Sequence, residues 1–386
     1  MKRLESGKVP QMRILYLHQY FRKAEEAGSH RSWYIAEALC KAGHQVHIVT
    51  ATQEPKNYSE EIYPNLCVHY IYNPYKQEMG FYERLLSFFR FTWRAFRKAK
   101  NIPFDAIYAT STPLTIGLIA LGLKFFHQKK YIFEVRDLWP QVPIEMGILR
   151  NIFLKKMSYF LERKIYQNSE KIVALSPAMQ NYIEKIVPAK SVICVPNMSD
   201  CELFVPQEKK EKNTFRLLYA GSIGVANGLE RVVAWAERCI WAEFWIVGDG
   251  AKRNSIESLV QEKKLKNVYF FKEKNKEALQ DFFSKVDAVI ISFADYQILE
   301  TCSPNKFFDA LAAGKVCITN TAGWIKDLIE EKECGFYANS PEDFEAKLKA
   351  VFQKPELIAK MQKNARKLAE SSFERQILCK KIVELF

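Results

Sequence analysis

The segment 300–314 carries the strongest chemical signal in this sequence. It reads ETCSPNKFFDALAAG, and Ser303 and Pro304 are residue types that begin helices. Lys306 then falls in the first turn, where the positive end of the helix dipole makes a cation unfavourable. A bound anion such as a diphosphate would reverse this penalty, and Lys306 would stabilise it as a leaving group. The simpler alternative is an ion pair between Lys306 and Asp309.

Glycine-rich turns follow two apolar runs in the second half of the chain. Two glycines directly after a strand can form a loop whose amides bind phosphate. Neither turn is a Walker loop or a strict Gly-x-Gly-x-x-Gly, which disfavours a dinucleotide cofactor. The second turn has the alternative interpretation of a tight strand–helix connection. The candidate ligand-binding residues of these turns are Gly221, Ser222, Gly224, Gly248, Asp249 and Gly250.

Polar residues also follow predicted strands in the first half of the chain. His18 follows the first strand, and Gly28 and Ser29 open the next helix, whose free amides would attract an anion or a hydroxyl-rich ligand. Arg136 and Asp137 end a central strand, where they could orient an acceptor hydroxyl and support charge. The simpler alternatives are that Ser29 caps the helix and that Arg136 pairs with Asp137.

The sequence does not indicate a metal site. It contains no Asp-x-Asp pair that could hold Mg²⁺ on a diphosphate, and its nine cysteines are scattered without a Cys-x-x-Cys pair. We therefore expect no metal and no cofactor. The charge of a diphosphate would be met by helix amides and by Lys306.

Short apolar runs alternate with helical patterns along almost the whole chain. Continuous apolar runs are typical of parallel strands covered on both faces, so their alternation with helices predicts doubly wound α/β sheets. A polar stretch at 206–213 divides the chain, and we expect two Rossmann-like domains facing each other across a cleft. The predicted strands are 13–17, 45–50, 67–72, 106–109, 131–135, 172–175, 192–195, 215–220, 244–247, 268–271, 288–292 and 316–319. The predicted parts are an extension at 1–11, a first domain at 12–200, a linker at 201–214, a second domain at 215–370 and a last helix at 371–386 that returns to the first domain.

The net charge of +13 is concentrated in the first half of the chain. Residues 1–200 hold 28 Lys and Arg against 17 Asp and Glu, whereas residues 201–386 hold 29 against 27. A basic first half suggests a polyanionic partner for that half only, either nucleic acid or an anionic membrane. No recognisable RNA or DNA motif supports the first of these.

The segment 81–98 has a strong helical period. Its aromatic residues fall on one broad arc and its arginines gather on the opposite side, which is typical of a helix lying among lipid headgroups. The alternative is a helix that covers the sheet with its arginines extended to solvent. The expected membrane contacts are Phe81, Phe88, Arg90, Trp93, Arg94 and Arg97.

With these residues in view, the sequence resembles the retaining GT-B glycosyltransferases of family 4, and most of all those that build bacterial capsule and O-antigen units. The resemblance runs from about Met12 to the C-terminus. It depends on the order and spacing of several motifs together: the Gly28 loop, Arg136–Pro140 (RDLWP), Ala174–Pro177 (ALSP), Tyr219–Gly224, Gly248–Gly250 and Ser303–Gly314.

The resemblance implies that a nucleotide sugar binds the second domain and an acceptor the first, with retention of anomeric configuration. The loop 221–224 and Lys306 would hold the diphosphate, and Asp309 would take the ribose hydroxyls. Glu300, Ser303 and Asn305 would lie near the donor sugar or its phosphates. The sequence departs from the family at two points: Thr301 stands where a first glutamate is common, with Asp309 in place of the second, and the 221–224 loop lacks a following basic residue.

We therefore expect a cytoplasmic enzyme bound to the inner face of the bacterial plasma membrane. It would move a sugar, from a UDP-sugar in the first instance, to a polyprenyl-diphosphate-linked saccharide. The alternatives are a sugar-nucleotide 2-epimerase or hydrolase of the same fold and, from another class, a basic nucleic-acid-binding protein.

Overall fold

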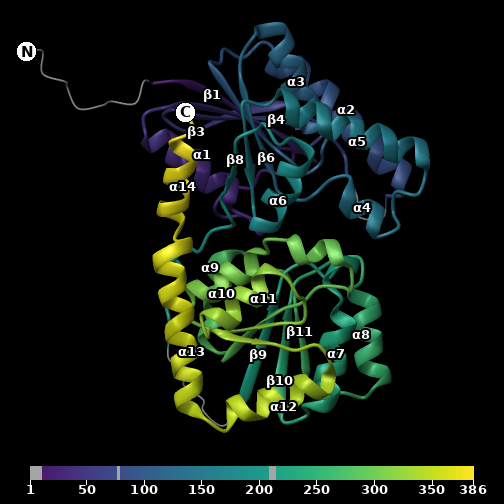
Figure 1. Ribbon diagram of the computed structural model, residues 1–386, viewed down its shortest axis with the longest axis vertical. Coiled ribbons are helices and arrows are strands. Elements are labelled where there is room, and N and C mark those ends of the chain that lie inside the picture. Colours follow the sequence, from purple (N-terminus) through teal and green to yellow (C-terminus); the bar gives the residue numbers. More distant parts are fainter. Residues whose placement is uncertain (1–10, 76–78, 208–213) are drawn as a thin grey trace, which may run out of the picture.

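Two β-sheets with helices packed on their faces organise the chain (Figure 1). The computed structural model describes residues 11–75, 79–207 and 214–386, so residues 1–10 of the expected extension and residues 208–213 of the expected linker lie outside the described residues. The first sheet has the strand order β3-β4-β2-β1-β5-β6-β7-β8 and the second β11-β10-β9-β12-β13-β14. Every pairing is parallel except that of β3 with β4. The doubly wound α/β prediction is confirmed.

The first sheet and its helices are built from the residues before the crossing near residue 200. Its strands are β1 (Arg13–Leu17), β2 (Gln45–Thr52), β3 (Tyr58–Tyr63), β4 (Leu66–Tyr72), β5 (Ala106–Thr110), β6 (Tyr131–Val135), β7 (Lys171–Ala174) and β8 (Val192–Cys194). Its helices are α1 (Arg31–Lys41), α2 (Phe81–Ala99), α3 (Ile116–His127), α4 (Gln141–Glu145), α5 (Ile152–Asn168) and α6 (Pro177–Ile186).

The second sheet is built from the residues after the crossing. Its strands are β9 (Phe215–Ala220), β10 (Ala242–Val247), β11 (Val268–Phe271), β12 (Ala288–Ile291), β13 (Val316–Thr319) and β14 (Gly335–Tyr337). Its helical elements are η1 (Val225–Asn227), α7 (Leu229–Arg238), α8 (Arg253–Glu262), α9 (Lys276–Ser284), η2 (Gln297–Thr301), α10 (Asn305–Ala312), α11 (Trp324–Glu331), α12 (Pro341–Phe352), α13 (Pro355–Leu368) and η3 (Ala369–Phe373). The last helix, α14 (Arg375–Val383), packs on the first domain.

All of the predicted strands are present, whereas β3 and β14 were not predicted. β3 reads YSEEIY and is an antiparallel edge strand, so it lacks the continuous apolar character of a buried parallel strand. β14 has only three residues and begins with Gly335. Both strands form by pairing with a neighbouring strand, and neither has a hydrophobic pattern that would predict a strand from the sequence.

Each sheet changes winding direction at one pair of strands, and these two places are where a ligand is expected. In the first sheet the change falls between β1 and β5, and in the second between β9 and β12. The residues directly after these four strands are His18, Ser111, Gly221 and Ser292. A ligand site built from the fold should therefore lie around these residues.

A buried ion pair ties α1 to β6 beside the first of these places. The Arg31 side chain donates to Glu134 Oε2 from Nε (3.0 Å) and from a terminal nitrogen (2.7 Å), and both side chains are at most 1% exposed. Tyr108 donates to the same oxygen at 2.6 Å. Burial alone would raise the pKa of Glu134, but Arg31 lowers it below the ordinary value, so the carboxylate stays ionised and fixes the start of α1.

The chain crosses between the two sheets twice, and the crossings lie side by side. Ser199 in the first crossing accepts a hydrogen bond from the Arg375 amide (2.9 Å) and donates its own amide to Phe373 (2.8 Å). Beyond this point α14 packs along α1 of the first domain, as the yellow C-terminal helices in Figure 1 show. Rings of His44 and Phe386 meet at a centroid distance of 6.3 Å.

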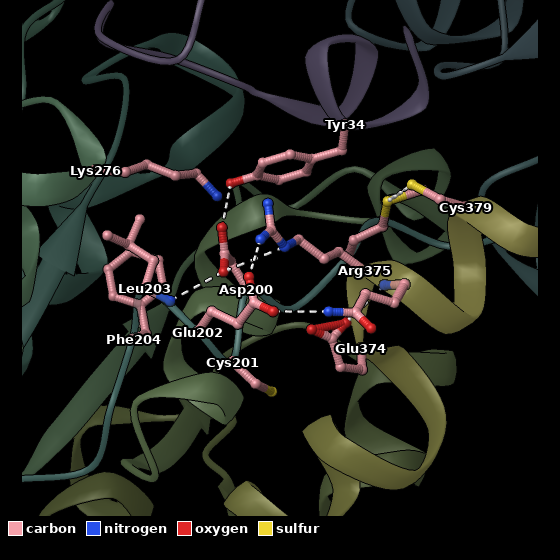
Figure 2. A network of polar contacts seen from close by, with 12 residues as sticks. Tyr34, Asp200, Cys201, Glu202, Leu203, Phe204, Lys276, Glu374, Arg375 and Cys379 are labelled. Carbon is pink, nitrogen blue, oxygen red and sulfur yellow. Dashed lines mark hydrogen bonds and ion pairs between the residues drawn. The ribbon is translucent and has the colours of Figure 1, made fainter. Parts of the chain in front are cut away.

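A polar network closes the junction of these crossings (Figure 2). Asp200 accepts hydrogen bonds from the Tyr34 hydroxyl (2.8 Å) and the Leu203 amide (3.0 Å). Arg375 forms an ion pair with Asp200 (3.5 Å), another with Glu202, and lies 5.1 Å from the Tyr34 ring centroid. Side chains from both crossings and from α1 therefore hold one another in place.

Candidate active site

Lys306 lies at the place where the second sheet changes direction. Its Nζ is 4.0 Å from the ring centroid of Tyr219 on β9 and 5.9 Å from that of Phe293 after β12. It donates a hydrogen bond to Asn227 Oδ1 at 3.2 Å. Within the described ranges no carboxylate pairs with this amine, and burial lowers the pKa of Lys306 to about 7. The site therefore holds a cation on aromatic faces without a counter-ion.

Backbone amides near Lys306 add further donors. In the described part of the chain, the amides of Asn305 and Lys306 in the first turn of α10 and those of Ser222 and Gly224 have no hydrogen-bond partner. Those of Gly221 and Ile223 already donate, to Val247 O at 2.9 Å and Asp249 O at 2.8 Å. Unpaired amides beside an ammonium group form an anion site.

The turn at 248–250 is explained by packing between two loops. A Cβ on Gly248 would lie 1.9 Å from the carbonyl oxygen of Gly221, and one on Gly250 would lie 2.5 Å from that of Ile223. The Asp249 side chain accepts from the Gly250 amide at 2.7 Å. The structure thus accounts for these three residues by the tight connection that the sequence left as an alternative. Gly221 differs, because a Cβ there would lie 3.7 Å from Lys306 Nζ.

Asp309 does not pair with Lys306, so that alternative is wrong. Its Oδ1 lies 2.7 Å from Nζ of Lys276 at the start of α9, and both side chains are less than 10% exposed. Burial raises the pKa of Asp309, while Lys276 acts in the opposite direction. The carboxylate is therefore occupied inside the protein, and its position does not favour the ribose-binding role that the resemblance implied.

Ser303 and Ser29 do not cap helices, although the sequence predicted a cap at Ser303 and left one at Ser29 as an alternative. α10 begins at Asn305 without a side-chain cap, and Ser303 Oγ instead accepts from the Asn197 amide at 3.1 Å. α1 begins at Arg31 after His30, again without a side-chain cap. Both serines instead accept hydrogen bonds from residues distant in sequence: Ser29 from Arg136 and Ser303 from Asn197. Ser303 joins the crossing to α10 and is 8% exposed.

Glu300 is the carboxylate left free beside α10. It lies in η2 and is half-buried, and its side chain has no hydrogen bond or ion pair to any other described residue. The neighbouring Thr301 carbonyl accepts from the Ser176 hydroxyl of α6 at 2.6 Å, which ties η2 to the first domain. Glu300 is thus placed where the two domains meet and is available to a ligand.

The Arg136 guanidinium contacts two other candidate residues of the first domain, His18 and Ser29. Its terminal nitrogens lie 2.8 Å from Ser29 Oγ and 3.3 Å from His18 Nε2, and its amide donates to Ser111 Oγ at 3.0 Å. Asp137 instead accepts from the Thr112 hydroxyl at 2.8 Å, so the Arg136–Asp137 pair that the sequence allowed is not formed. These contacts place the guanidinium where the first sheet changes direction.

His18 is held neutral and in one tautomer. It is 3% exposed, and burial together with Arg136 lowers the pKa of its imidazole well below the ordinary value. Because the guanidinium can only donate, His18 Nε2 must accept and the hydrogen sits on Nδ1. Because Nδ1 carries the hydrogen, it can donate a hydrogen bond but cannot act as a base. It has no partner in the described structure, so it is available to a ligand.

The two sets of residues meet across the domain boundary. Ser29 Oγ lies 3.5 Å from Asn305 Oδ1 at the start of α10, and the Ile298 amide of η2 donates to Glu145 of α4 at 3.0 Å. Gly28, with φ 123°, turns the chain into Ser29. The arrangement offers an anion site on one domain and a guanidinium with a neutral imidazole on the other. Sequence reasoning predicted the helix and loop amides beside Lys306 but not its contacts with the rings of Tyr219 and Phe293 or with the Asn227 side chain, because these contacts carry no local signal.

A second surface lies on α2, α3 and α5. On α2, Phe88 turns inward and meets the Trp139 ring at 6.3 Å, whereas Trp93 is 63% exposed. Arg90 and Arg97 are also exposed, and Arg94 donates to the Tyr72 carbonyl at 2.7 Å. The prediction of opposite aromatic and basic faces is therefore wrong, because both kinds of side chain share the outer face. The side chain of Phe81 lies outside the described residues.

The sequence did not single out α5, which carries more of this surface. Exposed apolar side chains run along one stripe of the helix, and Lys164 Nζ lies 5.5 Å from the Phe160 ring centroid. α3 packs against both α2 and α5 and exposes two phenylalanines at its end. The exposed apolar residues of α3 and α5 are Phe125, Phe126, Ile152, Phe153, Met157 and Phe160. No helix in the described ranges is both long and apolar enough to span a bilayer.

Two family models match this chain, and each covers one of the two domains. The model for Glycosyltransferase Family 4 matches residues 30–203, and that for Glycosyl transferases group 1 matches residues 201–368. The matches meet at the first chain crossing. Together they include every candidate site residue described above except His18, Gly28 and Ser29.

A curated relative matches part of the chain. It is the "Putative colanic acid biosynthesis glycosyl transferase WcaI" of Escherichia coli (strain K12), which is 26% identical over 238 residues. The match covers 58% of this chain and 58% of that protein, so the chain spans less than two thirds of the relative's length.

Solved structures share the fold over nearly the whole chain. Sucrose-phosphate synthase from Thermosynechococcus elongatus has a TM-score of 0.82 at 17% identity, covering 97% of this chain and 98% of that one. Anabaena Alr3699/HepE in complex with UDP-glucose has a TM-score of 0.71 at 14% identity (97% and 99%). WaaG, a glycosyltransferase involved in lipopolysaccharide biosynthesis, has a TM-score of 0.67 at 14% identity (96% and 99%). The predicted GT-B fold is confirmed.

Proposed function

The chain belongs to the family 4, group 1 glycosyltransferases, and on this premise we propose that it transfers a sugar from a nucleotide-diphosphate donor to a lipid-linked saccharide during polysaccharide synthesis. The observation that carries the proposal is the amine of Lys306, which forms no ion pair with a described residue, beside four backbone amides that have no partner in the described part of the chain, where the second sheet changes direction. A diphosphate supplies the negative charge that this site lacks.

A UDP-sugar is the donor that we propose. Among the structural neighbours, Alr3699/HepE was solved with UDP-glucose and an Escherichia coli trehalose-6-phosphate protein with UDP-2-fluoro glucose. These neighbours are distant in sequence, so they support the choice of donor class and not the sugar.

In the proposed reaction the acceptor hydroxyl oxygen bonds to C1 of the sugar as the bond from C1 to the diphosphate oxygen breaks. Lys306 and the amides of α10 stabilise the charge that develops on the departing diphosphate. We propose that Arg136 and His18 bind the acceptor or the diphosphate, and that the acceptor proton leaves with the departing diphosphate. We propose retention of anomeric configuration, as the resemblance to retaining enzymes of this family implies. We also propose that no metal is needed, because these cations and amides offset the diphosphate charge.

The acceptor is proposed to be held at an anionic membrane. The outer faces of α2, α3 and α5 combine exposed aromatic side chains with Lys and Arg, which is the composition of a surface that lies among lipid headgroups. The surface belongs to the more basic half of the chain. A polyprenyl-diphosphate-linked saccharide would be presented there to the first domain.

A donor panel followed by product analysis tests the proposal. The true nucleotide sugar at 100 times its dissociation constant should stabilise the protein by about 2.7 kcal/mol in a thermal-shift screen of UDP-, GDP- and ADP-sugars. With that donor and a polyprenyl-linked saccharide, the elongated saccharide should form. Epimerised or free sugar in the absence of acceptor would instead show an epimerase or a hydrolase.

A further inference from the structure

Three metal-binding side chains gather on the first sheet, apart from the candidate active site. His47 on β2 is the register partner of Cys67 on β4, and His69 lies two residues further along β4. One ligand atom from each residue lies within 4.8 Å of the others. His47 and Cys67 are near the amino ends of their strands, whereas the active-site residues follow the carboxyl ends. The cluster therefore serves a different purpose from the transfer site.

The two imidazoles are already spaced as metal ligands. His47 Nδ1 and His69 Nε2 are 3.2 Å apart, and two zinc–nitrogen bonds at a tetrahedral angle place their nitrogens about 3.3 Å apart. Ser59 Oγ lies 2.7 Å from His69 Nδ1 and can accept its hydrogen, so the lone pair of His69 is on Nε2 and points toward His47 Nδ1, from which it accepts a hydrogen bond in the metal-free protein. A polar group that orients a ligating histidine in this way is a regular feature of zinc sites.

Two charged residues of opposite sign lie near the cluster: Lys98 of α2, which acts on His69 and Cys67, and Glu61, which acts on Cys67. A metal site here would use two neutral imidazoles and a thiolate, and the bound metal would favour loss of the thiol proton. Glu61, the register partner of Cys67 on β3, offsets the charge of the ion.

We propose that His47, Cys67 and His69 bind a zinc ion that joins β2 to β4 beneath the last turn of α2, with water in the fourth position. Cys67 loses its thiol proton to solvent on binding. The ion takes no part in sugar transfer, so this site stands or falls independently of the proposed function.

Cobalt(II) titration of the metal-free full chain tests the site. We expect one equivalent to give visible d–d bands with a near-ultraviolet thiolate-to-cobalt band, and zinc to displace it. Cys67→Ser should remove the thiolate band. Ser59→Ala, which leaves all three ligands in place, should weaken binding about tenfold.

Cys40→Ser is the matched control, because Cys40 is another partly exposed thiol of the same domain and lies on α1 outside the cluster. It should keep the full spectrum. Zinc should also raise the thermal midpoint of the wild type and the Cys40→Ser variant, but not that of Cys67→Ser. A thiolate band that survives in a folded Cys67→Ser variant, or no band in the wild type, would overturn the proposal.

Discussion

At the scale of single residues, Lys306 differs from most buried cations because no carboxylate of the described residues forms an ion pair with it. Its amine lies over the Tyr219 ring and donates to Asn227, and both groups are neutral. Cation–π contact and one hydrogen bond hold the side chain in place but do not offset its desolvation. The pKa of about 7 follows from this balance, and it makes the charge of the site sensitive to pH.

Binding of a UDP-sugar should therefore weaken as the pH rises. Below pH 7 the amine is already protonated, so this group adds no pH dependence there. Above pH 7 the free protein must take up a proton to bind the diphosphate, and the dissociation constant should rise about tenfold from about pH 6 to about pH 8. Isothermal titration calorimetry in buffers of different ionisation enthalpy would measure both the affinity and the proton uptake.

The Lys306→Arg variant is the control for this titration, because a guanidinium stays charged throughout the range. Its affinity should not follow pH in this way, whatever its absolute value. A wild-type affinity that is flat across the range would show that Lys306 does not titrate in contact with the diphosphate.

The sequence predicted the chemistry at Lys306 better than it predicted the partners of neighbouring residues. A cation in the first turn of a helix breaks a local rule, and this signal is visible without a structure. The sequence suggested a local partner for each of three residues: a helix amide for Ser29 and Ser303, and Lys306 for Asp309. In the structure each of them instead bonds a residue more than 30 positions away. Local patterns show which polar groups need a partner, whereas the tertiary fold decides which partner they find.

At the scale of elements, the strands were predictable where they are buried on both faces, and the helix surfaces were less so. The period of α2 correctly predicted a helix, but the direction of each face depends on how α2 packs on α3 and the sheet. Phe88 and Trp93 are both aromatic and lie five residues apart, yet the first packs inward and the second faces solvent. A hydrophobic pattern alone cannot separate a core face from a membrane face.

The outer faces of α2 and α5 should bind anionic vesicles. Replacing Phe153 and Phe160 by Ser should remove most flotation with anionic liposomes, since both side chains are more than 60% exposed and would lose their apolar contact with lipid. Arg90→Glu with Arg97→Glu should lower partitioning by at least about thirtyfold, at about 1 kcal/mol for each lost cation.

Ile240→Ser is the matched control for these variants. Ile240 is 74% exposed but lies on the second domain, between α7 and β10, so its loss should leave flotation unchanged. If the variant with Phe153 and Phe160 replaced floats as well as the wild type, α5 does not contribute to membrane binding.

At the scale of the whole molecule, two chain crossings hold the domains together. Arg375 follows the second crossing and reaches Asp200 and Glu202 of the first (Figure 2). The return of the last helix to the first domain was expected from topology, but the polar junction was not, because its members come from three distant parts of the sequence. Because the junction links both crossings to α1, it helps to hold the two domains, and with them the two sets of active-site residues, in one relative position.

Arg375→Met should destabilise the protein without affecting the donor site. Asp200 is 4% exposed, and loss of its cation should lower the free energy of unfolding by about 1.5–3 kcal/mol. The thermal midpoint should fall, while the affinity for UDP should change less than about twofold, because Lys306 and its partners all lie on the second domain.

Lys380→Met, on the same helix but exposed and without an ion pair to any other described residue, should leave the midpoint unchanged. A fall of similar size in both variants would mean that the helix surface in general, and not the Arg375 junction, carries the effect.

The affinity of the Lys306→Met variant for UDP, measured by isothermal titration calorimetry beside the wild type, tests the central claim most directly. Loss of a charge-assisted contact to the diphosphate should raise the dissociation constant about 10- to 100-fold. Lys326→Met is the control, since Lys326 also lies over a tyrosine ring, that of Tyr337 at 5.0 Å, but on α11. An unchanged dissociation constant for a folded Lys306→Met variant would contradict the assignment of this lysine to the donor diphosphate.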